Sequence, residues 1–95
     1  MKAAISSGLL DVSVIVTTRP AVFYGVQIIT NGTNDATVTV YSEQSATGII
    51  LAQGVVLGAS QFGLIGLSHP VSAEKGIYVA ISGTGAKCIV TFDHV

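Results

Sequence analysis

Charge is scarce in this chain of 95 residues. Only 9% of the residues are charged, with four Lys or Arg against five Asp or Glu and a formal net charge of -1. An ordinary soluble domain carries about 25% charged residues. Such a surface offers a monomer little protection against association. The composition therefore predicts that much of the surface is buried against copies of the chain or against another protein.

The scattered basic residues also exclude one class of partner. Nucleic-acid binding needs Lys or Arg clustered against phosphates, and the four basic residues are spread along the chain. We therefore expect no nucleic-acid partner.

Cysteine and tryptophan are nearly or wholly missing. Cys88 is the single cysteine, so no disulfide forms within the chain, and a secreted, disulfide-stapled module is disfavoured. Asp11 interrupts the apolar N-terminal run, and no convincing cleavage site follows, so no signal peptide is predicted. We expect the chain to fold in a cytoplasm.

Motifs that carry chemistry are also missing. There is no Cys-x-x-Cys or His-x-x-x-His spacing for zinc, and segment 58–62 (Gly-Ala-Ser-Gln-Phe) lacks the closing glycine of a nucleophile elbow. Cys88 is predicted to be a buried, inert thiol. His69 is predicted to be an exposed loop residue, and Asp93 and His94 a solvated tail. We expect no enzyme activity, no metal and no cofactor.

Turn formers and β-rich runs dominate what is present. Residues 22–30 and 36–41 flank five consecutive turn formers and predict a hairpin in which Ile28 faces Val38. Residues 77–82 and 87–93 predict a second hairpin in which Val79 faces Val90. The alternate residues of these runs form the predicted core: Val26, Ile28, Val38, Val40, Ile77, Val79, Val90 and Phe92.

Residues 48–67 are apolar enough to be tested as a membrane helix. Their five glycines argue against a helix, since each costs about 1 kcal/mol relative to alanine, so no membrane span is expected. Short strands at 49–53, 55–57 and 61–67, closed by 68–70, fit better.

A strand over residues 10–18 completes a set of seven or eight short strands. This pattern predicts an all-β fold, a compact β-sandwich of jelly-roll type. Residues 1–8 are predicted to be a flexible N-terminal arm, and residues 9–95 a single domain.

Some large side chains fall on the faces opposite the predicted core. Outward tyrosines and aliphatic residues beside small ones suit subunit contacts. The candidate subunit-interface residues are Ile15, Phe23, Tyr24, Ile29, Tyr41, Tyr78 and Ile89.

The spacing of the β-rich runs and the turns between them resembles that of a known protein family. Phe23-Tyr24-Gly25, the run from Asn31 to Tyr41, the run from Ser45 to Gly48, and the runs 75–79 and 82–86 carry the resemblance. Together they resemble small virion proteins of tailed bacteriophages, namely capsid decoration (cement) proteins and head-binding fibre domains. The resemblance implies a jelly roll that stabilises a capsid as a homotrimer. Its partners would be itself and the major capsid protein, without metal or cofactor, in a virion assembled in the host cytoplasm.

A second function stays open. A carbohydrate- or receptor-binding module of a phage tail fibre would need an exposed aromatic pocket with polar partners. The absence of tryptophan counts against it. A small enzyme has no positive signal in the sequence.

Overall fold

The fold is built almost wholly from strands. The structure, a computed structural model, describes residues 5–95, apart from the side chains of residues 67–69. One short 3-10 turn, η1 (Gly58–Ser60), interrupts the strands. The strands are β1 (Ile5–Ser6), β2 (Val14–Thr17), β3 (Ala21–Ile29), β4 (Ala36–Ser42), β5 (Ile49–Val56), β6 (Phe62–Ala73), β7 (Ile77–Ser82) and β8 (Lys87–His94). The predicted strand 10–18 is thus shortened to β2.

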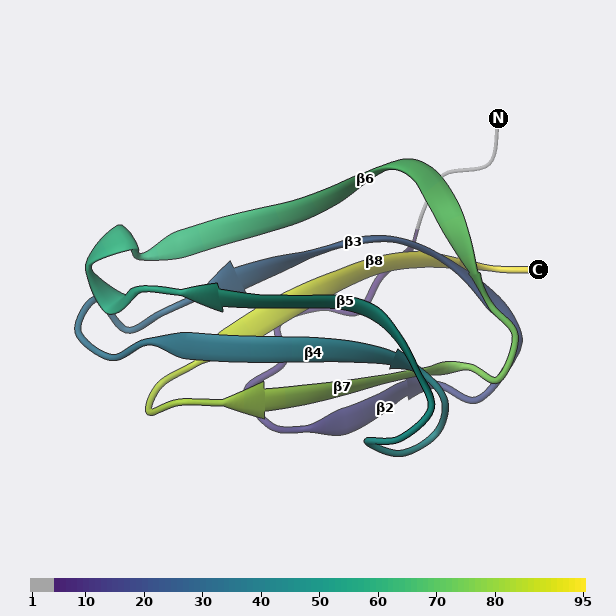
Figure 1. Cartoon of the computed structure of the whole chain (residues 1–95), viewed down its shortest axis with the longest axis horizontal. Helices are drawn as coiled ribbons and strands as arrows, with labels where there is room; N and C mark the ends of the chain where they lie inside the picture. Colours follow the sequence, from purple (N-terminus) through teal and green to yellow (C-terminus); the bar gives the residue numbers. More distant parts are fainter. Residues whose placement is uncertain (1–4) are drawn as a thin grey trace.

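The strands form two four-stranded antiparallel sheets packed face to face (Figure 1). Sheet A has the order β1-β8-β3-β6, and sheet B has the order β2-β7-β4-β5. Only β4 and β5 are consecutive strands of one sheet; every other connection crosses between the sheets. The prediction of an all-β sandwich is confirmed.

The predicted hairpin pairings are wrong. β3 pairs with β6 and β8, whereas β4 pairs with β5 and β7, so the segment 22–41 crosses from one sheet to the other. β7 and β8 also lie in opposite sheets. A turn of five residues can span the roughly 10 Å between packed sheets as well as the roughly 4.8 Å between paired strands. The alternation of apolar and polar residues predicts which side chains point inward, but it does not predict which strand is the pairing partner.

The predicted core is confirmed despite the wrong pairing. All eight predicted residues are buried, because the inward sides of β3 and β4, and of β7 and β8, face the same interior from opposite sheets. Phe23, Ala36, Ala73 and Cys88 complete the centre of this core.

Glycines explain the segment that resembled a membrane helix. A Cβ at Gly54 would lie 2.8 Å from Ile65 Cδ1, and a Cβ at Gly63 would lie 2.7 Å from Val56 Cγ2. These two glycines therefore let β5 and β6, the edge strands of opposite sheets, approach each other. β5 is one strand instead of two, and β6 continues through 68–70, where a loop was expected. Within the described part of the chain, no helix is long and apolar enough to cross a membrane.

Both ends of the described chain belong to sheet A. Ile5 and Ser6 pair with β8, and Ser7 continues the contact through its backbone N–H, which donates to the Val90 carbonyl at 2.9 Å. This part of the predicted arm is therefore held by the sheet. The expected solvated tail is also corrected: Asp93 is buried and His94 half-buried, because β8 extends through both and pairs with β3.

Candidate subunit interface

The outward side of sheet B is uncharged. None of the four strands of this sheet, all of them described, contains Asp, Glu, Lys or Arg. We call its outward side the sheet B face, and the strand register assigns to it Ile15, Thr37, Thr39, Tyr41, Ile50, Gln53, Val55, Tyr78, Ala80 and Ser82. A broad sheet surface without charge favours association with another surface.

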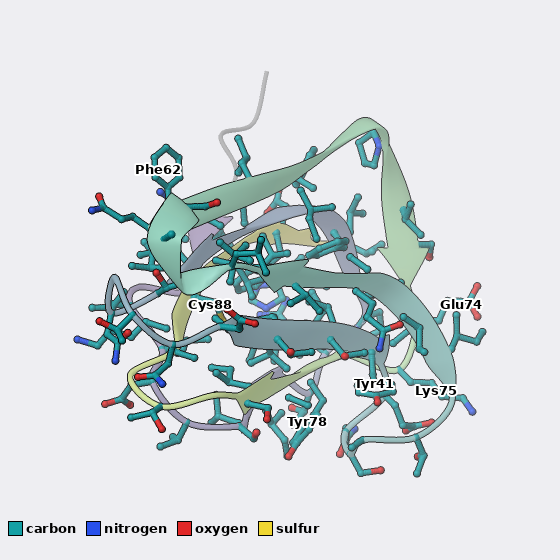
Figure 2. The ribbon with its side chains drawn as sticks, turned by 60° about the vertical axis from the view of Figure 1, so that its left-hand side comes forward. Tyr41, Phe62, Glu74, Lys75, Tyr78 and Cys88 are labelled. Carbon is teal, nitrogen blue, oxygen red and sulfur yellow. The ribbon has the colours of Figure 1, made fainter. Side chains whose placement is uncertain are left out.

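A single row of large side chains crosses this face. Ile15 lies opposite Tyr78, Tyr78 opposite Tyr41, and Tyr41 opposite Ile50, so one residue from each strand contributes. The two tyrosine rings contact each other with centroids 6.4 Å apart and an interplanar angle of 51°. Ile15 and Ile50 at the ends of the row are 42% and 50% exposed. Figure 2 shows Tyr41 and Tyr78 together on the side of the molecule away from Phe62.

Three of the seven predicted interface residues thus meet on one surface. Ile15, Tyr41 and Tyr78 are brought together although residues 15 and 78 are far apart in the chain. Ile29 and Ile89 lie instead on the outward side of sheet A, each half-buried. Tyr24 is half-buried where the register of β3 shifts. Three members of the predicted set therefore lie on the sheet B face and two on the outward side of sheet A.

The prediction that Phe23 is an interface residue is wrong. Its side chain is fully buried in the core. Against β8, the register of β3 shifts between Phe23 and Gly25, with Tyr24 as the extra residue. A bulge of this kind reverses the inward and outward assignment on one side of it. Strict alternation counted back from Val26 therefore placed Phe23 on the wrong side.

Sequence reasoning missed a second group of exposed apolar residues. They lie on β5, on β6 and at the joint between them: Ile49, Ile50, Val55, Leu57, Phe62, Leu64 and Val71. The signal was present in the segment 48–67, where apolar residues occupy consecutive positions. A strand at a sheet edge buries only alternate residues, so the others remain exposed. This apolar edge adjoins the sheet B face through Ile50 and Val55.

The described residues offer little reactive chemistry. Among them, no group of three or more His, Cys, Asp or Glu side chains is placed to hold a metal ion. His94 Nε2 and Thr17 Oγ1 are 3.0 Å apart, and the His94 backbone N–H donates to Asp93 Oδ1 at 2.8 Å. The first contact joins the end of β8 to β2 in the opposite sheet, and the second lies within β8. His69 lies outside the residues whose side chains are described.

Cys88 is the one group with a clearly shifted pKa among the side chains that the structure describes. Burial raises the pKa of its thiol from 9.0 to about 11. Its side chain is fully buried in the core, which also contains Val26 and Val90 of sheet A. Since the thiolate is the reactive form, this cysteine is poorly placed to act as a nucleophile.

We expect Cys88 to be protected from a thiol reagent at pH 8 in the native protein and to react at once in urea.

Because the folded protein holds the thiol proton more tightly, this group's contribution to stability is full below pH 9 and is lost as the pH rises through about 11. Urea unfolding at several pH values, with Cys88→Ala as control, measures this pH dependence of the free energy of unfolding. An equal alkaline loss in both proteins would contradict the assignment.

Comparison with protein-family models, with curated proteins and with solved structures finds no match to this chain.

Proposed function

We propose that the protein is a structural protein that self-associates through the sheet B face. The observation that carries the proposal is the uncharged row of Ile15, Tyr78, Tyr41 and Ile50 across four strands that contain no charge. Tyrosine is enriched at interface centres, where its ring supplies buried area and its hydroxyl finds a partner. Fully burying one large apolar side chain contributes about 1.5–3 kcal/mol.

The strand order supports the finer assignment to the jelly-roll class. β1 pairs with β8, β2 with β7, β3 with β6 and β4 with β5, so the pairs are nested like the two arms of one long hairpin. Folding such a hairpin into two sheets produces the eight-stranded double Greek key. Jelly rolls serve in viral capsids and in lectins. A virion role is therefore compatible with this topology.

The resemblance to phage decoration proteins gives the proposal its specific form. The protein would be a homotrimer seated on the outer shell of a phage capsid, with the major capsid protein as its second partner. Closed cyclic symmetry would bury the sheet B face without open-ended growth. Three weak contacts to the shell would then act together through effective concentration. The protein would strengthen the shell without changing its architecture.

Heating of particles tests this role. Particles assembled from the phage's shell proteins without this protein are expected to release their contents at a lower temperature than complete particles. Adding the purified protein back should restore the difference, because the added contacts stabilise the assembled shell by mass action. Tyr78→Lys protein, with the face disrupted, serves as the matched control and should restore little. Equal heat resistance with and without the protein would contradict the proposal and favour the receptor-binding alternative.

A further inference from the structure

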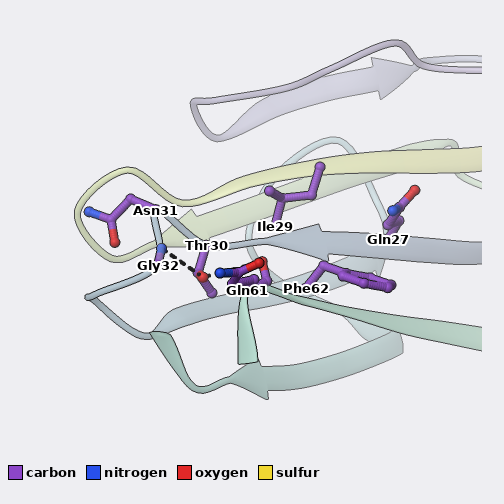
Figure 3. Close-up of a pocket in the computed structure, with 7 residues that line it drawn as sticks. All are labelled: Gln27, Ile29, Thr30, Asn31, Gly32, Gln61 and Phe62. Atoms are coloured by element: carbon purple, nitrogen blue, oxygen red, sulfur yellow. Dashed lines mark hydrogen bonds between the residues drawn. The ribbon is translucent and has the colours of Figure 1, made fainter. Parts of the chain in front are cut away.

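A hollow lies on the outward side of sheet A, away from the sheet B face. Its volume is about 430 Å³, within the range of roughly 300–1,000 Å³ that is usual for small-molecule sites. It is formed where the end of β3 and the following turn meet the start of β6 (Figure 3). The lining residues are Gln27, Ile29, Thr30, Asn31, Gly32, Gln61 and Phe62, none of them charged.

One wall of the hollow is an exposed aromatic ring. Phe62 is 60% exposed although it lies in a strand. It is the cross-strand neighbour of Ile29, and Gln27 lies opposite Leu64, two residues along β6. In Figure 3 the ring extends from β6 toward the Gln27 end of the hollow. The ring therefore presents a flat apolar surface beside a polar side chain.

The backbone of Gln61 is held in an unusual conformation at the edge of this wall. Its φ of +67° is the one positive value among the described residues other than glycine. The Gln61 N–H donates to the Gly58 carbonyl at 3.2 Å, and the Thr30 N–H donates to the Gln61 carbonyl at 2.8 Å. Backbone strain of this kind persists only when the surroundings fix it, and it gathers at functional sites. The side chain of Gln61 is thus presented from a fixed point.

Thr30 organises the same corner. Its hydroxyl lies 3.0 Å from the Gly58 carbonyl and 3.2 Å from the Gln61 carbonyl as donor, and it accepts from the Gly32 N–H at 3.2 Å (Figure 3). The single hydroxyl proton of Thr30 is therefore already shared between two carbonyls and is not available to a ligand. Its role here is to position Gln61 and the turn.

The free polar groups of the hollow are two carboxamides. Within the described part of the chain, the side chains of Gln27 and Gln61 make no hydrogen bond, whereas Asn31 Oδ1 accepts from the Thr33 and Asn34 N–H groups. Each carboxamide offers both a donor and an acceptor. They flank the ring of Phe62 without a charged group among the lining residues.

We propose that this hollow binds a neutral pyranose sugar, with Phe62 packed against the apolar C–H side of the ring and Gln27 and Gln61 bonded to its hydroxyls. A sugar hydroxyl both donates and accepts, which matches a carboxamide better than it matches a charged group. Lys87 lies opposite Ile29 on β8 and is not among the residues that line the hollow. An acidic sugar would therefore lack its counter-charge.

The site is independent of the proposed self-association. Gln27 and Phe62 lie on sheet A and Gln61 immediately precedes Phe62, so a trimer formed through the sheet B face leaves them accessible. Three copies in one assembly would give weak single-site binding the benefit of multivalency on a glycan-coated surface.

Titration of the isotope-labelled full chain with methyl glucoside, methyl galactoside, methyl mannoside and N-acetylglucosamine, followed by amide NMR, tests the proposal. The side-chain amide signals of Gln27 and Gln61 should shift on addition of at least one of these sugars. The expected dissociation constant is on the order of 1 mM, because a small ligand makes few contacts. Phe62→Ala should weaken binding about tenfold, and Phe62→Tyr should retain it.

Leu64→Ala is the matched control, since Leu64 is 71% exposed on the same strand and does not line the hollow. It should bind as the unaltered protein does. No shift with any of the four sugars would overturn the proposal. Equal loss of binding in Leu64→Ala and Phe62→Ala would also overturn it.

Discussion

The Val40→Asp protein is expected to be unfolded at 25 °C. Val40 is fully buried in β4, and a carboxylate there would face an apolar interior. An unpaired buried charge costs several kcal/mol, and the lost valine burial adds about 1.5–3 kcal/mol. The total stability of a domain is only about 5–15 kcal/mol. Far-UV circular dichroism and urea unfolding measure the result.

Thr91→Asp is the control for Val40→Asp. Thr91 is half-buried on β8, on the outward side of sheet A. The substitution therefore introduces the same charge outside the core. It should remain folded, with a loss of no more than about 1 kcal/mol, because surface substitutions have small effects. A folded Val40→Asp protein with the same urea midpoint as Thr91→Asp would show that the core is placed wrongly.

Val26 and Val38 show which part of this fold the sequence predicts and which part it does not. Both were assigned to the core because apolar residues alternate along their strands, and both are buried. Their predicted hairpin was wrong because alternation describes one strand at a time. It specifies which side of a strand is apolar and does not distinguish a partner in the same sheet from a strand facing it across the core.

The candidate interface shows the same limit. Tyr41 and Tyr78 were assigned outward from parity alone, yet their alignment with Ile15 in one row depends on pairing between β2, β7 and β4, which parity does not determine. Phe23 was misplaced because a one-residue bulge leaves no local pattern in the sequence. The hollow at Phe62 could not be predicted, since it requires the pairing of β3 with β6.

Tyr78→Lys is expected to convert the assembled protein into monomers. Tyr78 lies at the centre of the row, between Ile15 and Tyr41. An unpaired ammonium there would be desolvated on association, and loss of a tyrosine anchor alone costs about 2 kcal/mol or more. Association should therefore weaken by at least about 30-fold. Size-exclusion chromatography with light scattering measures the mass, and circular dichroism confirms that the variant is folded.

Leu64→Lys is the matched control for the Tyr78 variant. Leu64 is more exposed than any residue of the row and lies on sheet A, so the same charge should leave the assembly intact. Dissociation of Leu64→Lys together with persistence of Tyr78→Lys would move the interface from the sheet B face to the apolar edge formed by β5 and β6.

Sedimentation equilibrium of the unaltered chain tests the central claim of self-association most directly. At micromolar concentration the protein is expected to sediment as a single species with three times the mass of the chain, because a closed assembly would cover its uncharged sheet B face. A monomer at the same concentration would contradict the account.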